Sequence, residues 1–271
     1  MPGFASYDEL INKITAAAQA TDFHFHKASS ALQGAGWWHS LWKATGTPAA
    51  GSDPAATPGT QYNASSAGAL SFSNVSPMTR HGLSFGAVAS QNLTLMVYDR
   101  LVGVSGISLA TTGVKTVNST ALPRYTDGVG VQPWLEVTTA TTTTAPNVNL
   151  NSYTNDSGVA GRSGTGLTFP AAATVLTAAI GPLPPQAGDK GVRSVESLNV
   201  ATAAAAGVVN LILIKPLEYI PLTQSIWNER DLVMQFSKLP RIYDDACLGL
   251  MLFASGTTSS QAWGQIKTGY N

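Results

Sequence analysis

The first apolar pattern in the chain has the spacing of a helix. Between Ser6 and Ala20, apolar residues recur three and four positions apart, which places them on one helical face. Ser6 is a favourable N-cap residue, and Glu9 follows it at the spacing of a capping box. The sequence therefore predicts an amphipathic N-terminal helix. Its apolar positions are Tyr7, Leu10, Ile11, Ile14 and Ala18.

Most of the remaining pattern is typical of β-strands. Phe23 to His26 alternates aromatic and polar residues, as a half-buried strand does. Leu93 to Val104 and Val208 to Ile214 are nearly continuous apolar runs, which indicate central strands. Segments rich in Gly, Pro and Ser separate such runs. The predicted fold class is mostly β, with two tandem similar units of the sandwich or jelly-roll type behind a short N-terminal helix.

A repeated motif supports the tandem arrangement. Leu122-Pro123-Arg124 returns as Leu239-Pro240-Arg241, and each copy leads into an apolar run. Upstream, the block Asn92–Leu101 matches Asn210–Leu217 in the same order. Two matched blocks at nearly one offset predict a duplicated unit of about 115 residues. We therefore expect an N-terminal helix and arm at 1–44, a first β unit at 45–147 and a second at 148–271.

The repeated motif is interpreted as a structural corner at the entry to a strand. Proline fixes its own φ and favours an extended residue before it, and the nearby Arg, Tyr and Asp side chains can bond within the turn. A sugar-binding or catalytic role is the alternative, but a corner is needed once per unit and a catalytic site is not. The candidate corner residues are Pro123, Arg124, Tyr125, Asp127, Pro240, Arg241, Tyr243 and Asp244.

The composition of the chain excludes some classes of function. Charged residues are 11% of the chain and the net charge is zero, which argues against nucleic-acid binding. A surface that meets other protein would explain so little charge, and so would an extracellular Thr/Ser-rich β-protein. The single Cys247 rules out an intramolecular disulfide. We see no secretory signal and no apolar stretch of membrane-spanning length, so we expect synthesis in a cytoplasm and no membrane partner.

Candidate chemistry is sparse. His24 and His26 would share one strand face, but no third metal ligand is evident. Val159 to Gly164 resembles a phosphate loop without the Gly-Lys-Ser/Thr ending. We therefore expect no cofactor, no metal and no enzymatic activity. The aromatic and apolar residues near the N-terminus are instead candidate anchors for core or interface, because large aromatic residues concentrate in both. They are Phe4, Tyr7, Leu10, Ile11, Trp37, Trp38 and Trp42.

Several stretches resemble a group of tailed-bacteriophage virion structural proteins, of the capsid cement or decoration type. They span nearly the whole chain: residues 4–11, 122–132, 153–162, 187–195 and 239–248. The resemblance implies a protein of the outer capsid surface, made in the host cytoplasm, that binds the major capsid protein and itself as a homotrimer. The alternatives are a tail, collar or fibre component, or a module that binds a carbohydrate or receptor.

Overall fold

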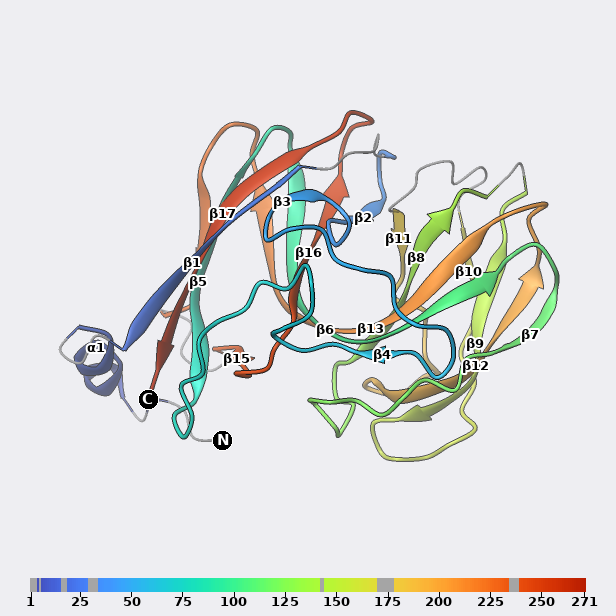
Figure 1. The fold of residues 1–271 in the computed structure, drawn as a ribbon, viewed down its shortest axis with the longest axis horizontal. Coiled ribbons are helices and arrows are strands. Elements are labelled where there is room, and N and C mark those ends of the chain that lie inside the picture. Colours follow the sequence, from blue (N-terminus) through green and yellow to red (C-terminus); the bar gives the residue numbers. More distant parts are fainter. Residues whose placement is uncertain are drawn as a thin grey trace.

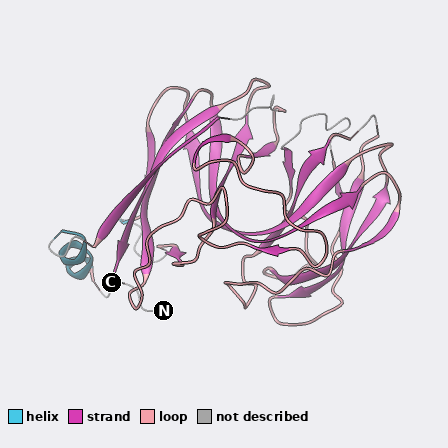
Figure 2. Ribbon diagram, viewed as in Figure 1, coloured by secondary structure: helices cyan, strands magenta, loops and turns pink. Residues whose placement is uncertain are grey.

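β-Strands dominate the structure, and one short helix lies at the end of the molecule (Figure 2). The structure is a computed structural model that describes residues 4, 6–15, 19–28, 34–141, 144–169, 178–233 and 239–271. The predicted fold class, mostly β and sandwich-like behind a short N-terminal helix, is confirmed.

The described strands form three antiparallel sheets. The first outer sheet has the order β14-β5-β17-β1-β3, with β15 also paired to β5. Its strands are β1 (Ala20–Ala28), β3 (Thr45–Thr47), β5 (Arg80–Ala89), β14 (Asn228–Asp231), β15 (Arg241–Ile242) and β17 (Gln261–Tyr270). The second outer sheet has the order β10-β9-β12-β7. Its strands are β7 (Gly113–Thr116), β9 (Asn147–Asn155), β10 (Leu167–Thr168) and β12 (Val192–Thr202).

A central sheet lies between the two outer sheets and has the order β13-β8-β11-β2-β16-β6-β4. Its strands are β2 (Trp38–Ser40), β4 (Thr60–Gln61), β6 (Leu93–Ser108), β8 (Gln132–Thr139), β11 (Ala178–Ile180), β13 (Val208–Leu222) and β16 (Leu248–Ala254). An additional pairing of β13 with β6 closes six of these strands into a ring. The first outer sheet lies in one lobe of the molecule and the second outer sheet in the other. Figure 1 shows β6 and β13 running together from the first of these lobes to the second.

Each of these two long strands contributes to three hydrophobic cores. In β6, Leu95 and Val97 face the core shared with the first outer sheet, whereas Met96 faces the core inside the ring. Beyond the middle of the strand, Val102 and Val104 belong to the core shared with the second outer sheet. Side chains alternate between the two faces of a strand, so one continuous strand can complete two sandwiches and the ring between them.

The predicted division into two consecutive β units is wrong. Strands from both sides of the proposed 147/148 boundary are combined in the first outer sheet, where β1, β3 and β5 join β14, β15 and β17. The strands interpreted as copies, in blocks 92–101 and 210–217, pair directly with each other. A sheet edge accepts any strand of suitable register, however distant in sequence, so the lobes of the fold do not follow the order of the chain.

The N-terminal region is part of the body rather than a free arm. Helix α1 (Tyr7–Thr15) begins as expected, because the main-chain N–H of Glu9 donates to Oγ of Ser6 at 3.1 Å. The helix packs on β1 and β17 of its own chain. Strands β1 and β2 also fall within the predicted arm at 1–44, yet they belong to the first outer sheet and to the ring.

Candidate functional site

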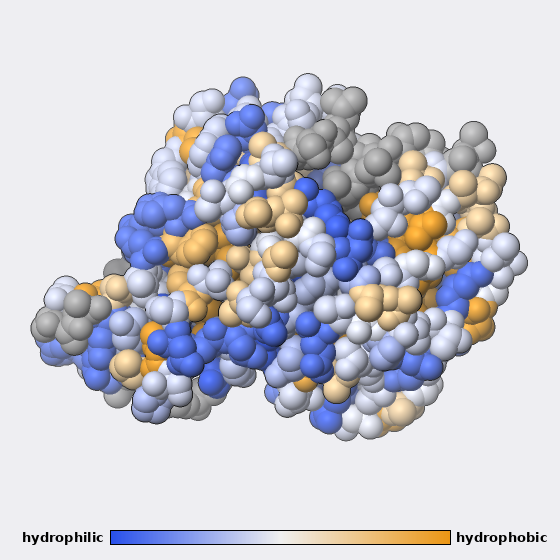
Figure 3. Space-filling view, in the orientation of Figure 1, coloured by the Kyte–Doolittle hydropathy of each residue, from blue (hydrophilic) through white to orange (hydrophobic). Residues whose placement is uncertain are grey.

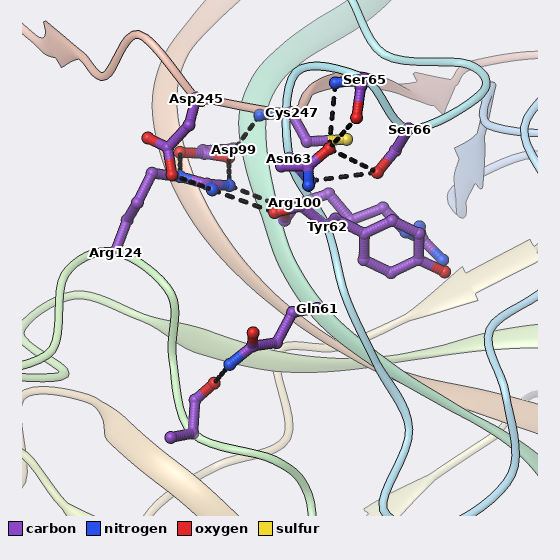
Figure 4. Close-up of polar contacts among 11 residues, drawn as sticks. Gln61, Tyr62, Asn63, Ser65, Ser66, Asp99, Arg100, Arg124, Asp245 and Cys247 are labelled. Carbon is purple, nitrogen blue, oxygen red and sulfur yellow. Dashed lines mark hydrogen bonds and ion pairs between the residues drawn. The ribbon is translucent and has the colours of Figure 1, made fainter.

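A buried ion pair holds the first copy of the repeated motif against the central sheet. The guanidinium of Arg124 makes two parallel bonds to Asp99 of β6, with Nη2 to Oδ1 at 2.6 Å and Nε to Oδ2 at 2.9 Å (Figure 4). Nη1 also donates to the main-chain carbonyl of Tyr62 at 3.0 Å and to the carboxylate of Asp245 at 3.2 Å. Burial raises the pKa of Asp99, and the contact with Arg124 opposes that shift.

A second buried ion pair lies at the next residue of β6. The guanidinium of Arg100 donates from both terminal nitrogens to the two carboxylate oxygens of Glu136, each at 2.8 Å. The rings of Trp42 and Tyr62 cover that guanidinium, with centroids 4.6 and 4.7 Å from its central carbon. Oγ of Ser40 donates to the same carboxylate at 2.6 Å. Burial lowers the pKa of Arg100, but the charge and hydrogen bonds of Glu136, together with the nearby Tyr62 and Tyr98, outweigh burial and raise that pKa.

Together the two ion pairs form a seam where β6 passes from one lobe to the other. Neighbouring residues of a strand point to opposite faces, so Asp99 and Arg100 reach partners on different elements. We assign the seam a structural role, because removing one partner of a buried pair leaves an uncompensated buried charge and is strongly destabilising. Cys247 lies beside it, and burial raises the pKa of this thiol to about 12.

The two copies of the motif do not occupy equivalent positions. Arg124 is 3% exposed, whereas Arg241 is half-buried and lies 4.1 Å over the ring of Tyr243. The prediction of one corner of the same kind in each of two similar units is therefore wrong. The copies instead touch one another, because the rings of Tyr125 and Tyr243 meet edge to face at 5.0 Å. The Tyr125 hydroxyl also donates to the carbonyl of Arg241 at 3.3 Å.

Of the remaining corner residues, the two aspartates lie in turns. Asp127 accepts a bond from the N–H of Val129 at 3.1 Å, and Asp244 accepts one from the N–H of Val75 at 3.2 Å. Pro123 and Pro240 are both half-buried. These contacts are within the scaffold and bring no set of polar groups together around an open site.

The candidate anchors at the N-terminus are divided between core and surface. Leu10 is 2% exposed, and Ile11 is 49% exposed. The hydroxyl of Tyr7 donates to a main-chain carbonyl just after β14 at 2.9 Å. Phe4 packs on an imidazole of β5 with ring centroids 5.7 Å apart. Of this group, only Ile11 is substantially exposed.

The three candidate tryptophans have different surroundings. Trp42 is 2% exposed and belongs to the interior, and Trp37 packs on the core of the second lobe. Trp38 packs at the edge of the core that lies inside the ring of strands, and it extends this core to the surface. Its ring contacts Tyr219 and Phe253, at centroid distances of 6.0 and 5.3 Å. We call Trp38, Tyr219 and Phe253 the Trp38 cluster.

A groove on the outward face of the first outer sheet was not predicted from the sequence. It has a volume of about 440 Å³ and is lined by two exposed tryptophans, Trp227 and Trp263, with His24, His26 and Gln265 between and beside them. The two tryptophans are 36 positions apart in the chain, and only the strand order brings them to one face. The strand alternation of His24 and His26 was the one sequence signal for this surface.

Within the described ranges, no three His, Cys, Asp or Glu side chains gather closely enough to hold a metal ion. The same ranges contain no helix long and apolar enough to cross a membrane. Comparisons with protein-family models, with curated proteins and with solved structures gave no match.

Proposed function

We propose that this chain is a structural protein of a tailed-phage virion, a cement or decoration protein that binds and stabilises the capsid shell. It acts as a homotrimer on the outer capsid surface, and the major capsid protein is its partner. The proposal extends the resemblance in the sequence. The feature of the molecule that supports it best is the Trp38 cluster.

The Trp38 cluster is suited to docking on another protein. Tyr219 is 41% exposed and Phe253 is 37% exposed, and both rest on Trp38. Trp and Tyr are enriched among the residues that dominate protein–protein binding energy. Because the cluster continues inward to the core of the ring, its rings are held in place before any partner binds, which lowers the entropic cost of association.

The body that carries the Trp38 cluster is also suited to binding and stabilising other protein subunits. β6 and β13 pass through both lobes, and the buried seam ties β6 to β8 and to the segment that carries Arg124. On the face drawn in Figure 3, hydrophilic clusters are separated by broad areas of near-neutral residues. With charged residues at only 11% of the chain, much of this surface can meet protein without burying unpaired charge, which is costly.

Capsid binding can be tested by co-sedimentation of the purified protein with expanded capsids. The double variant Tyr219→Ser, Phe253→Ser should lose capsid binding by at least about tenfold, the equivalent of about 1.4 kcal/mol. Val114→Ser, which removes an apolar residue 60% exposed on β7, is the matched control and should bind as the wild type does. Thermal melts of all three proteins verify folding.

Two further measurements separate the proposal from its alternatives. Gel densitometry of purified virions should give hundreds of copies for a cement protein, whereas a tail, collar or fibre component would give a few tens or fewer. Light scattering should give the mass of a trimer. A strictly monomeric protein that does not sediment with expanded capsids would overturn the proposal.

A further inference from the structure

We propose that the groove on the first outer sheet is a binding site for a neutral glycan. We call it the sheet groove, and its working residues are Trp227, Trp263, His24 and Gln265. This inference is independent of capsid binding, because the groove and the Trp38 cluster consist of different residues. Its volume of about 440 Å³ lies in the range of small-molecule sites.

Trp227 packs against the sheet and is held there. Its ring rests on the main chain of Gly86 in β5, where any Cβ would overlap the ring. The indole N–H donates to Oε2 of Glu229 at 3.3 Å, which fixes the rotation of the ring. Even so, Trp227 is 47% exposed. Part of the ring is therefore in contact with the sheet, and a large apolar surface remains open to solvent.

Trp263 is a second platform on the same face. In the strand register, Trp263 of β17 lies opposite His26 of β1, and the two rings stack with centroids 5.2 Å apart at an angle of 12°. Trp263 is 39% exposed. As with Trp227, the packing of one side orients the ring before a ligand arrives, and this pre-organisation favours affinity.

Uncharged hydrogen-bonding groups lie beside the two platforms. Gln265 follows Trp263 by two positions on β17 and faces the same way, and its register partners are Gly86 on one side and His24 on the other. The amide offers both donors and an acceptor, and the imidazole offers one of each when neutral. Exposed apolar ring faces bordered by such groups complement a saccharide, which has apolar C–H faces and hydroxyl edges.

The charges at the groove favour a neutral ligand. The carboxylate of Glu229 is compensated by Lys267, whose Nζ lies 3.2 Å from Oε1, and it also accepts a bond from Ser84. The hydrogen bond from Ser84 is the main cause that lowers the pKa of Glu229, so this group stays ionised and paired. A nucleic acid would need unpaired cations to neutralise its phosphates, and the only lysine beside the groove among the described residues is already paired.

The test is a panel of immobilised neutral glycans, followed by calorimetric titration with the best binder and with the hexasaccharides of β-1,4-linked glucose and N-acetylglucosamine. We expect binding by the wild type. Trp227→Ala and Trp263→Ala should each weaken it by at least about tenfold, equivalent to about 1.4 kcal/mol. Gly86→Ala keeps both rings but displaces Trp227, so it should also weaken binding. Val114→Ser should leave binding unchanged.

Three outcomes would overturn the inference. The first is a panel without any hit for the wild type. The second is glycan binding that persists in both tryptophan variants. The third is a change of oligomeric mass in Trp227→Ala or Trp263→Ala, measured by light scattering, without a change in glycan affinity. That third result would assign the groove to contacts between copies of the chain.

Discussion

Arg124 and Arg241 occupy the same position of one tripeptide, yet they meet opposite environments. Arg124 is 3% exposed and bound to the buried carboxylate of Asp99, with the exposed carboxylate of Asp245 as a second partner. Arg241 is half-buried, and its guanidinium lies over an aromatic ring at the edge of the first outer sheet. The comparison shows that a local motif fixes the bend of the main chain, whereas the role of its side chain is set by strands far away in the sequence.

The largest effect should come from removing the interior arginine. Arg124→Ala leaves Asp99 buried without its partner, and breaking a buried pair in this way costs about 3–5 kcal/mol. The free energy of unfolding, measured in urea, should fall by that amount. A loss below about 1 kcal/mol, the range of an exposed pair, would contradict the assignment of a buried seam.

Lys27 extends the comparison of the two arginines, because its side chain is buried with main-chain carbonyls as partners instead of a carboxylate. Nζ of Lys27 donates to the carbonyls of Ala44 and Ala49 at 3.0 and 3.1 Å, and burial lowers its pKa from 10.5 to about 8. Between these two values the unfolded chain binds more protons than the folded one. The contribution of Lys27 to stability should therefore rise as the pH increases from about 8 towards 10.5.

This rise can be isolated by urea unfolding at a series of pH values for the wild type and for Lys27→Met. All other titrating groups, such as Cys247, are present in both proteins, so their contributions cancel when the two free energies of unfolding are subtracted. The difference between the two free energies of unfolding should favour the wild type increasingly as the pH passes 8. Parallel curves would show that Lys27 keeps an ordinary pKa in the folded protein.

The smallest effect should come from the second arginine. Arg241→Ala removes a cation–π contact with Tyr243 at a partly exposed site, where such contacts contribute about 0.5–1 kcal/mol. Its urea midpoint should stay close to that of the wild type, and Arg241→Lys should lie between the two. A loss as large as that of Arg124→Ala would mean that the two copies of the motif are equivalent after all.

The sequence was a good guide wherever the determining contacts are local. The capped helix at Tyr7–Thr15 and the alternating strand at Ala20–Ala28 follow from neighbouring residues, and so does the mostly β class. Leu93 to Val104 was correctly read as a central strand. The role of its two charged residues, Asp99 and Arg100, could not be predicted, because their partners Arg124 and Glu136 are 25 and 36 positions away in the chain.

Long-range pairing explains the remaining differences. β6 and β13 resemble each other because both are long, doubly buried strands, and this shared requirement produced the appearance of a duplicated unit. The sheet groove was hidden for the same reason. Trp227 immediately precedes β14 and Trp263 lies on β17, the two strands that flank β5. Nothing in the sequence next to either tryptophan indicates that β5 brings them together.

The central claim is that the two lobes form one interlocked body, joined by β6, β13 and the buried seam. Hydrogen exchange in increasing urea tests it directly, by following amides of β12 in one lobe and β17 in the other. We predict that both strands lose protection at one urea concentration, and that Arg124→Ala lowers this concentration equally for both. If one lobe opened well below the other, or if the variant shifted only one of them, the lobes would be independent units and the claim would be wrong.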